Sequence, residues 1–95
     1  MKRSRIDTLC TILTISINGI KKTHIMYRAN LSHIQLEKFL NVLISKDLLI
    51  RTIDGDGSSY KTTSKGLEFI KEFEKIQILL GENNNKIKIP QRIYQ

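Results

Sequence analysis

The sequence predicts a mainly α-helical fold of the α+β class, and three observations support this prediction. Apolar residues recur at three- and four-residue steps in several segments, which is the spacing of amphipathic helices. A short turn at 28–31 separates two of these segments, and Ser32 after the turn is a residue type that caps helix starts. Two β-type segments flank a cluster of Gly, Asp and Ser at 54–59, as in a β-hairpin. One helix, two helices joined by a turn, a hairpin and a last helix make a winged helix-turn-helix.

Composition places the chain among small folded domains. Its 95 residues are enough for one core, and 40% hydrophobic with 26% charged residues is ordinary for a folded protein. The 16 Lys and Arg against 9 Asp and Glu give a net charge of +7, which favours a polyanionic partner, nucleic acid first and an anionic membrane second. The single cysteine, Cys10, excludes an internal disulfide and a cysteine-rich zinc site, and we expect it to be buried.

The N-terminal stretch does not have the pattern of a targeting segment. Residues 1–5 are basic, but polar residues interrupt the stretch that follows, so it is not the apolar part of a secretory signal. No apolar run approaches the length of a membrane span. We therefore expect an intracellular, cytoplasmic protein without a membrane partner.

The first helix is expected from about Ser4 to Asn18, and Gly19 should end it. Many β-branched residues lower its helix propensity, so a strand with a hairpin turn at Asn18 and Gly19 stays open as the alternative. The apolar spacing fits a helix better, with the core stripe Ile6, Leu9, Cys10, Leu13 and Ile17. The link over 20–22 should be extended and could form one strand of a small sheet, before Thr23 caps the next helix.

The two helices on either side of the turn at 28–31 are each expected to have an inward and an outward side. In the shorter helix Tyr27 and Arg28 should face outward, and the inward residues are Ile25, Met26 and Ala29. The longer helix should run from Ser32 to about Lys46 with the apolar stripe Ile34, Leu36, Phe39, Leu40, Leu43 and Ile44. Its opposite face has residue types that hydrogen-bond base edges and phosphates, namely Gln35, Lys38, Asn41 and Ser45.

The last helix is expected to begin near Thr63 or Ser64 and to be apolar on two sides. Steps of four, three and four residues give a heptad seam made of Phe69, Phe73, Ile76 and Leu80. A second stripe of Leu67 and Ile70 should pack on the domain. Because the seam then needs another partner, the simplest one is a second copy of the chain.

The end of this helix is ambiguous from the sequence. Gly81 and the three Asn residues that follow each cost a helix roughly 0.7 to 1 kcal/mol relative to Ala, which favours an end near Leu80. The heptad nevertheless continues through Asn83 to Ile87, and we expect the helix to persist in that direction, with a bend. The predicted organisation is a winged helix-turn-helix domain over 1–63, a dimerisation helix over 64–89 and a flexible tail over 90–95.

Three segments together resemble a known family. KTHIMYRANLS, LISKDLLI and YKTTSKGLEFI are similar to the small archaeal chromatin proteins of the ten-a type, winged-helix proteins first known from Sulfolobus. The resemblance covers roughly 4–80, and its YxxTxKG motif, Tyr60 to Gly66, is shared by many winged-helix regulators. It implies binding of double-stranded DNA through the winged helix, a dimer through an antiparallel coiled coil of the last helix, and association with the nucleoid.

The candidate DNA contacts come from the helix face, the start of that helix and the cations that the family geometry brings near the duplex. They are Lys21, Lys22, Arg28, Ser32, His33, Gln35, Lys38, Asn41, Arg51 and Lys61. The candidate dimerisation residues are Phe69, Phe73, Ile76, Leu80, Asn83 and Ile87. Asp54 and Asp56 place carboxylates at the tip of the hairpin, which opposes insertion of the tip into a groove. The same tip lacks the further acidic ligands of a calcium loop.

An enzyme is not expected. His24 and His33 are the only histidines, and neither a catalytic triad nor a glycine-rich phosphate loop is present. We expect no cofactor, no metal and no small-molecule ligand. Three functions stay open: a nucleoid architectural protein with low sequence specificity, a transcription regulator that reads a pseudo-palindromic operator, and a protein-interaction module that no longer binds DNA.

Overall fold

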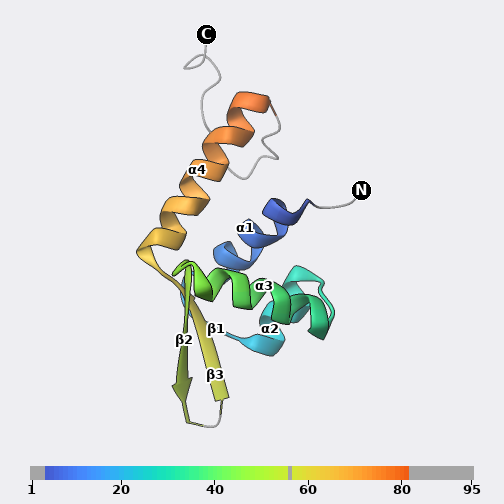
Figure 1. Ribbon diagram of the computed structural model, residues 1–95, viewed down its shortest axis with the longest axis vertical. Coiled ribbons are helices and arrows are strands. Elements are labelled where there is room, and N and C mark those ends of the chain that lie inside the picture. The colour runs from blue at the N-terminus through green and yellow to red at the C-terminus, as the bar shows by residue number, and fades with distance from the viewer. Residues whose placement is uncertain (1–3, 56, 82–95) are drawn as a thin grey trace.

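The computed structural model describes residues 4–55 and 57–81, and it confirms the mainly α, winged helix-turn-helix architecture (Figure 1). In chain order the elements are α1 (Arg5–Ile15), β1 (Ile20–Lys21), α2 (Lys22–Ala29), α3 (His33–Ser45), β2 (Leu49–Asp54), β3 (Gly57–Thr62) and α4 (Ser64–Leu80). Figure 1 shows α4 and α1 toward one end, α2 and α3 in the middle, and the β2–β3 hairpin extending at the other end.

α1 starts as predicted and ends early. The Oγ of Ser4 caps it by accepting a backbone N–H at 3.1 Å. The helix ends at Ile15 rather than near Asn18. The carbonyl of Ser16 accepts two backbone N–H groups at 3.1 Å, that of Gly19 in the turn after the helix and that of Thr62 in β3, so the chain turns here and the end of α1 is joined to the sheet.

The buried side of α1 differs in part from the predicted stripe. Ile6 is 44% exposed and Ile17 is half-buried, whereas Ile12, which was not in the stripe, is fully buried. The correctly predicted core residues are Leu9, Cys10 and Leu13. α1 contacts α2, α4 and β3, so it is enclosed on more than one side. This packing supplies the helix stability that its β-branched residues do not, and the strand alternative is wrong.

β1 confirms the expected extended link before α2. α2 begins at Lys22, with Lys21 at the N-cap position and no side-chain cap, so the predicted cap at Thr23 is wrong. The reason is that the pairing of β1 with β3 already fixes the backbone up to Lys21. α2 ends at Ala29, and its C-cap residue Asn30 has a left-handed φ of +58°, a conformation that Asn adopts more readily than most residues.

α3 has the predicted cap and nearly the predicted length. Ser32 and Gln35 form a capping box, in which Ser32 Oγ accepts the Gln35 N–H at 3.2 Å and Gln35 Oε1 accepts the Ser32 N–H at 3.0 Å. The buried residues of α3 are Leu36, Leu40 and Leu43, each at most 2% exposed. The helix therefore presents one leucine stripe to the core.

The three strands form an antiparallel sheet in the order β1-β3-β2. Tyr60 of β3 pairs with Ile20 of β1 and with Arg51 of β2. Alternate residues of a strand point to opposite faces, so Leu49, Tyr60 and Thr62, which are buried, define the inner face toward the helices. The outer face then carries the intervening residues of the hairpin.

The start of α4 is attached to the end of α3. Thr63 Oγ1 donates to the carbonyl of Asp47 at 2.6 Å, and Lys65 Nζ donates to the carbonyl of Lys46 at 2.9 Å. A Cβ on Gly66 would lie 2.3 Å from the carbonyl oxygen of Leu48, so only glycine fits there. The YxxTxKG motif is therefore a structural connection between α3, the sheet and α4.

α4 ends at Leu80, because Gly81 adopts a left-handed φ of +73° and its N–H bonds back to the last turn. The expected continuation of the same helix through Gly81 is therefore wrong. Asn83 and Ile87, on which that expectation rested, lie outside the described residues. In the described part of the chain, no helix combines the length and the apolar character needed to cross a membrane.

Candidate nucleic-acid interface

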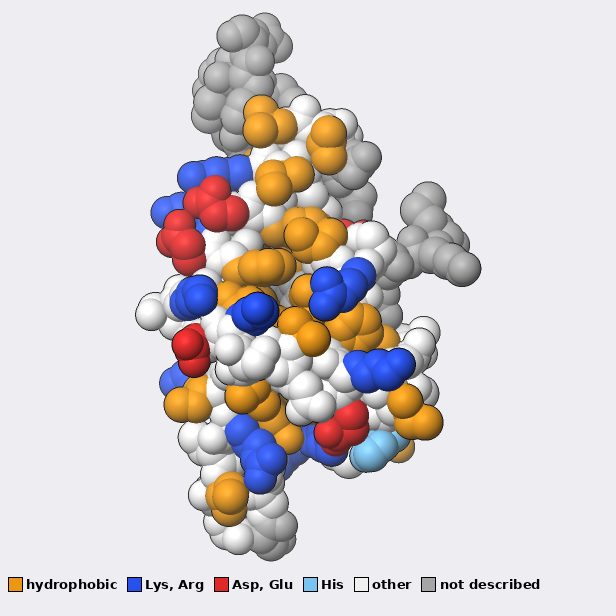
Figure 2. Space-filling view, viewed as in Figure 1, with side chains coloured by type: hydrophobic (Ala, Val, Ile, Leu, Met, Phe, Trp, Pro, Cys, Tyr) orange, Lys and Arg blue, Asp and Glu red, His pale blue; other side chains and the backbone are white. Residues whose placement is uncertain are grey.

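The outward face of α3 is polar and accessible. Lys38, Asn41 and Ser45 are exposed, while the leucine stripe on the other side of the helix is buried. Figure 2 shows basic side chains spread over the face of the molecule that carries α3 and the hairpin. Lys38 and Asn41 can reach phosphates and base edges without disturbing the core.

Ile34 also belongs to this outward face. We expected it in the buried stripe, but it is 69% exposed. The reason is geometric, because Ile34 lies two residues before Leu36 and therefore about 200° around the helix from the buried stripe. It adds an apolar side chain between the polar ones, and apolar contact with the thymine methyl group is one form of base recognition. The exposure of Ile34 could have been predicted from its angle around the helix relative to Leu36, but not from its residue type.

The start of α3 carries an ion-pair cluster. Lys22 Nζ, from the first residue of α2, pairs with Glu37 Oε2, and His33 Nε2 lies 3.8 Å from the same oxygen. The ion pair joins α2 to α3 and offsets part of the positive charge that Lys22 would present to a phosphate. Lys22 and His33, both predicted DNA contacts, are therefore brought together here.

Arg28 and Arg51 are exposed cations on α2 and β2, the elements that precede and follow α3 in the chain. Arg28 is exposed in the last turn of α2. Arg51 is exposed on the sheet face that also carries Tyr60, since the two are cross-strand partners, and it therefore stands on the same side of the sheet as the helices. Beyond it in β2, Ile53 is 73% exposed, so the hairpin extends past the core. The side chains of Asp54 and Asp56 at the acidic tip are not among those that the structure describes.

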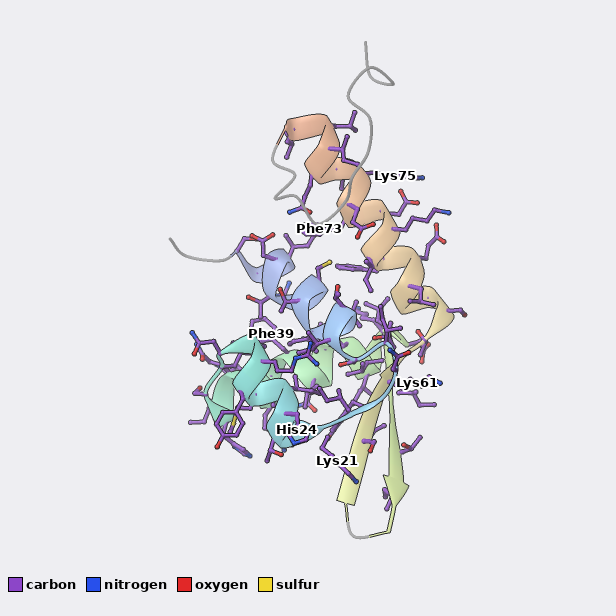
Figure 3. All side chains as sticks on the ribbon, turned by 180° about the vertical axis from the view of Figure 1, so that it is seen from behind. Lys21, His24, Phe39, Lys61, Phe73 and Lys75 are labelled. Atoms are coloured by element: carbon purple, nitrogen blue, oxygen red, sulfur yellow. The ribbon has the colours of Figure 1, made fainter. Side chains whose placement is uncertain are left out.

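Lys21 and Lys61 lie on the other face of the sheet. Lys21 pairs with Ser59, and Lys61 pairs with Ile50, so both lysines point away from the inner face of Tyr60. Figure 3, seen from behind, shows both lysines on that side. The structure thus divides the predicted cations into an α3 side and an outer sheet side. Contact of Lys21 and Lys61 with DNA stays a prediction.

The predicted seam of α4 forms one wall of an apolar groove. Phe69 and Phe73 are half-buried, Ile76 is 49% exposed and Leu80 is 64% exposed. The groove has a volume of about 300 Å³, and its other wall contains Ile6 and Leu48, which the sequence did not assign to it. The position of Ile6 in the first turn of α1 could have indicated its place in the groove wall, because an apolar side chain at the start of a helix has few core neighbours. Figure 2 shows apolar side chains continuing along α4 beyond this groove.

The second apolar stripe of α4 is correct only for Ile70. That residue is 8% exposed, whereas Leu67 is 46% exposed. The helix touches the domain at Gly66, and Leu67 lies about 100° around the helix from that contact, which turns it toward solvent. Exposed Leu79, at 79%, joins Leu80 at the end of the helix.

Among the described residues, no group of three or more His, Cys, Asp or Glu side chains could hold a metal ion. Among those residues, no buried side-chain nitrogen or oxygen atom lacks a hydrogen-bond partner. In the described part of the chain, the polar groups that could contact a ligand are therefore at the surface, on α3, the sheet and the rim of the α4 groove.

Solved structures similar to the chain include several DNA-binding proteins. Sso10a-2, a DNA-binding protein from Sulfolobus solfataricus, is 21% identical, with a TM-score of 0.67 and 98% of each chain covered. A mutant of MarR from E. coli, complexed with operator DNA, is 17% identical, with a TM-score of 0.66, and the match covers 98% of this chain and 69% of that one.

A mutant of MepR from S. aureus, bound to an oligodeoxyribonucleotide, is 18% identical with a TM-score of 0.65. That match covers 85% of this chain but only 64% of MepR, so the chain spans less than two thirds of that regulator. At these identities the structures share the fold. No curated protein sequence matches the chain at a significant level.

A family model described as winged helix-turn-helix matches residues 2–80, which include every described helix and strand. The capped turn between α2 and α3, the three-stranded sheet and the YxxTxKG connection are all inside this range. The chain therefore belongs to the winged helix-turn-helix family.

Proposed function

We propose that the protein binds double-stranded DNA as a homodimer with low sequence specificity, in an architectural role on the nucleoid. The observation that carries this proposal is the outward face of α3, where Ile34, Lys38 and Asn41 are exposed. Arg51 adds an exposed cation on the sheet face that lies on the same side as the helices. Sso10a-2 and the MarR and MepR mutants, which share the fold, are described as DNA-binding or are bound to DNA. The α3 face would enter the major groove, and Arg28 and Arg51 would contact the flanking phosphates.

The capping box supports low specificity. A glutamine reads adenine through both its carboxamide oxygen and its amide nitrogen. Gln35 Oε1 already accepts the Ser32 N–H, which directs this side chain back toward the start of α3. Asn41 is then the one exposed carboxamide on the outward face that is not engaged in the cap. Phosphate contacts, which carry no sequence information, would dominate the affinity.

A transcription regulator is the second candidate. Asn41 together with Ile34 could favour A·T pairs, through adenine and the thymine methyl group respectively. A binding survey over random duplexes separates the two functions. A ratio of specific to non-specific affinity below about tenfold would reject the regulator, and a ratio above about 10³ would reject a purely architectural protein.

For the dimer, we propose that the groove and the exposed end of α4 receive α4 of a second copy. Apolar side chains at Ile76, Leu79 and Leu80 are exposed on one helix, and burial of such a surface is favourable. The resemblance to the ten-a type proteins makes the antiparallel arrangement the expected one. Two winged heads would then lie at opposite ends of the pair and could bridge two duplexes.

The first experiment is fluorescence anisotropy of a labelled mixed-sequence duplex, titrated with the protein at several salt concentrations. The logarithm of the affinity should fall linearly with the logarithm of the salt concentration, with a slope of about −0.9 for each phosphate neutralised. If the duplex does not bind at low salt, the winged helix is a protein-interaction module, and the search moves to protein partners of α4.

A further inference from the structure

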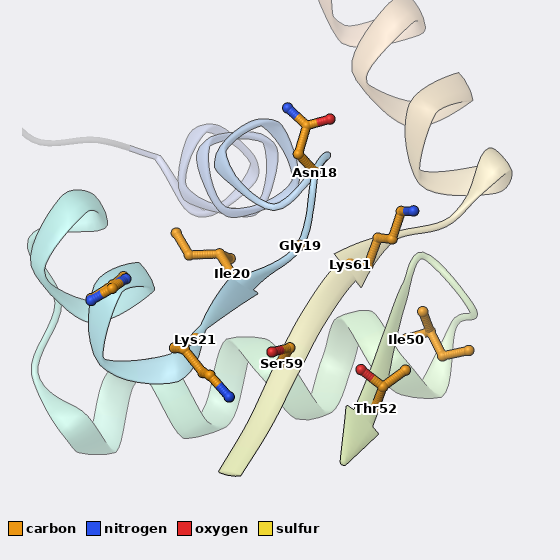
Figure 4. A pocket seen from close by; sticks show the side chains of 9 residues that line it. Asn18, Gly19, Ile20, Lys21, Ile50, Thr52, Ser59 and Lys61 are labelled. Carbon is orange, nitrogen blue, oxygen red and sulfur yellow. The ribbon is translucent and has the colours of Figure 1, made fainter. Parts of the chain in front are cut away.

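A depression with a volume of about 500 Å³ lies on the outer face of the sheet, away from α3 (Figure 4). Its floor consists of two cross-strand rows, one of Lys21, Ser59 and Thr52 and one of Lys61 and Ile50. The lining is completed by Asn18 and Gly19 of the turn before β1, by Ile20 of β1 and by His24 of α2. The volume is within the range of roughly 300 to 1,000 Å³ found for small-molecule sites.

The lining combines positive charge, hydrogen-bonding groups and an apolar surface. Lys21 and Lys61 provide ammonium groups, and no carboxylate is among the described lining residues. Thr52 and Asn18 add a hydroxyl and a carboxamide, while Ile50, at 51% exposed, offers an apolar surface beside Lys61. This combination matches a ligand that has an anionic group and an apolar body.

We propose that this depression binds a small organic anion, with the anionic group at Lys61 and the apolar body on Ile50. Lys61 has the leading role because Lys21 and Ser59 already take part in interactions within the chain. The sequence led us to expect no small-molecule ligand, and the two lysines, on β1 and β3, are far apart in the sequence and meet only in the folded sheet. The inference does not depend on DNA binding, since the site lies on the opposite face of the sheet from α3.

The position of the site gives the ligand a route to α3. β1 forms one edge of the depression and leads directly into α2, whose Lys22 is paired with Glu37 of α3. The opposite edge is the hairpin. A ligand on Lys61 and Ile50 would lie on the hairpin beside β1, and the backbone pairing of β1 with β3 connects the site to α2 and α3.

The test uses the full chain, phenyl phosphate as the probe, and backbone amide chemical shifts measured by NMR. We expect saturable shifts concentrated at 18–21, 50–52 and 59–61. Inorganic phosphate lacks the apolar body and phenol lacks the charge, so each should bind about tenfold or more weakly than phenyl phosphate. Shifts that do not saturate, or that spread evenly over all basic segments, would overturn the proposal.

Variants identify the two contacts. Lys61→Gln should weaken binding of phenyl phosphate about tenfold. Ile50→Thr, which keeps a β-branched residue on the strand, should weaken phenyl phosphate about fivefold but leave inorganic phosphate unchanged. Lys71→Gln on the exposed part of α4 makes the same charge change elsewhere and should have no effect. Equal losses in Lys71→Gln and Lys61→Gln would show general electrostatic attraction and reject the site.

A duplex is the competing occupant, and the same spectra address it. If a short duplex shifts the amides at 50–52 and 59–61 and Lys61→Gln weakens the duplex as much as the probe, the outer face binds nucleic acid and the small-anion assignment is wrong. Phenyl phosphate shifts that persist when the duplex occupies the α3 face would support two separate sites. The proposed DNA interface on α3 is tested by the anisotropy titration, so the two proposals can fail independently.

Discussion

At the scale of single residues, Gly66 shows how closely α4 approaches the end of α3. No side chain fits between the helix and the carbonyl of Leu48, since a Cβ would lie 2.3 Å from that oxygen and 2.5 Å from the Thr62 methyl carbon. The obstacle is largely backbone, which is held in place by its own hydrogen bonds and has little room to move. Any larger residue at position 66 must therefore displace the α3–β2 connection.

We predict that Gly66→Ala lowers the free energy of unfolding by about 1 to 3 kcal/mol, the usual cost of overpacking. Urea denaturation measures this directly. Ser64→Ala, an exposed substitution two residues earlier in the same helix, is the control and should stay within about 0.5 kcal/mol of the parent. A Gly66→Ala variant as stable as the control would mean that α4 can shift away from Leu48 without loss.

Lys38 is the cation at the centre of the outward face of α3. We predict that Lys38→Gln weakens duplex binding to a similar degree for all sequences and reduces the magnitude of the salt slope by about one. The measurement is the anisotropy titration at several salt concentrations. Lys75→Gln, on α4 and paired with Glu72, is the matched charge control. Unequal effects on different duplexes would instead show that Lys38 contacts a base.

At the scale of elements, the start of α3 combines two roles in one pair of residues. Ser32 and Gln35 satisfy backbone groups of the first turn, and the same turn faces the proposed duplex. The Lys22–Glu37 pair adds a side-chain link between α2 and α3. The orientation of the recognition helix therefore depends on local hydrogen bonds at its start and on the Thr63 and Lys65 bonds at its end.

We predict that Ser32→Ala lowers the free energy of unfolding by about 1 kcal/mol, because the first turn of α3 loses its cap. Gln35→Glu keeps the capping box, since Glu serves at this position as well as Gln. It should therefore leave stability nearly unchanged while weakening duplex binding through its negative charge. Thermal denaturation and anisotropy separate the two effects. Equal DNA affinity of Gln35→Glu and the parent would place the start of α3 away from the phosphates.

At the scale of the whole molecule, α4 exposes several large apolar side chains. The groove between α1 and α4 continues into Ile76, Leu79 and Leu80, each about half exposed or more. α3 lies in the middle of the long axis and the hairpin at the end opposite α4, so their basic side chains are away from the last turn of α4 (Figures 1 and 2). A dimer through α4 would thus leave both DNA-binding ends accessible.

We predict that Leu80→Asp converts a dimer to a monomer, as measured by light scattering, because a charge would replace an apolar contact in the interface. Leu80 is 64% exposed in the single chain, so the fold should be retained. Phe73→Asp should also give a monomer, and Lys71→Asp on an exposed part of α4 is the control. An unchanged dimer mass for both apolar variants would locate the dimer interface elsewhere.

The sequence by itself determined the order of the elements, the cap at Ser32, the approximate start of α4 and the hairpin, because these depend on residues a few positions apart. Only the tertiary structure decided how the end of α1 is held, because the carbonyl of Ser16 accepts a bond from Thr62 of β3 as well as one from the local turn at Gly19. It also decided that Ile12 is buried and Ile34 exposed, since burial depends on how the neighbouring elements pack against each helix. For the same reason the sequence identified the α3 cation Lys38 but could not separate it from Lys61, which strand pairing turns to the other face of the sheet.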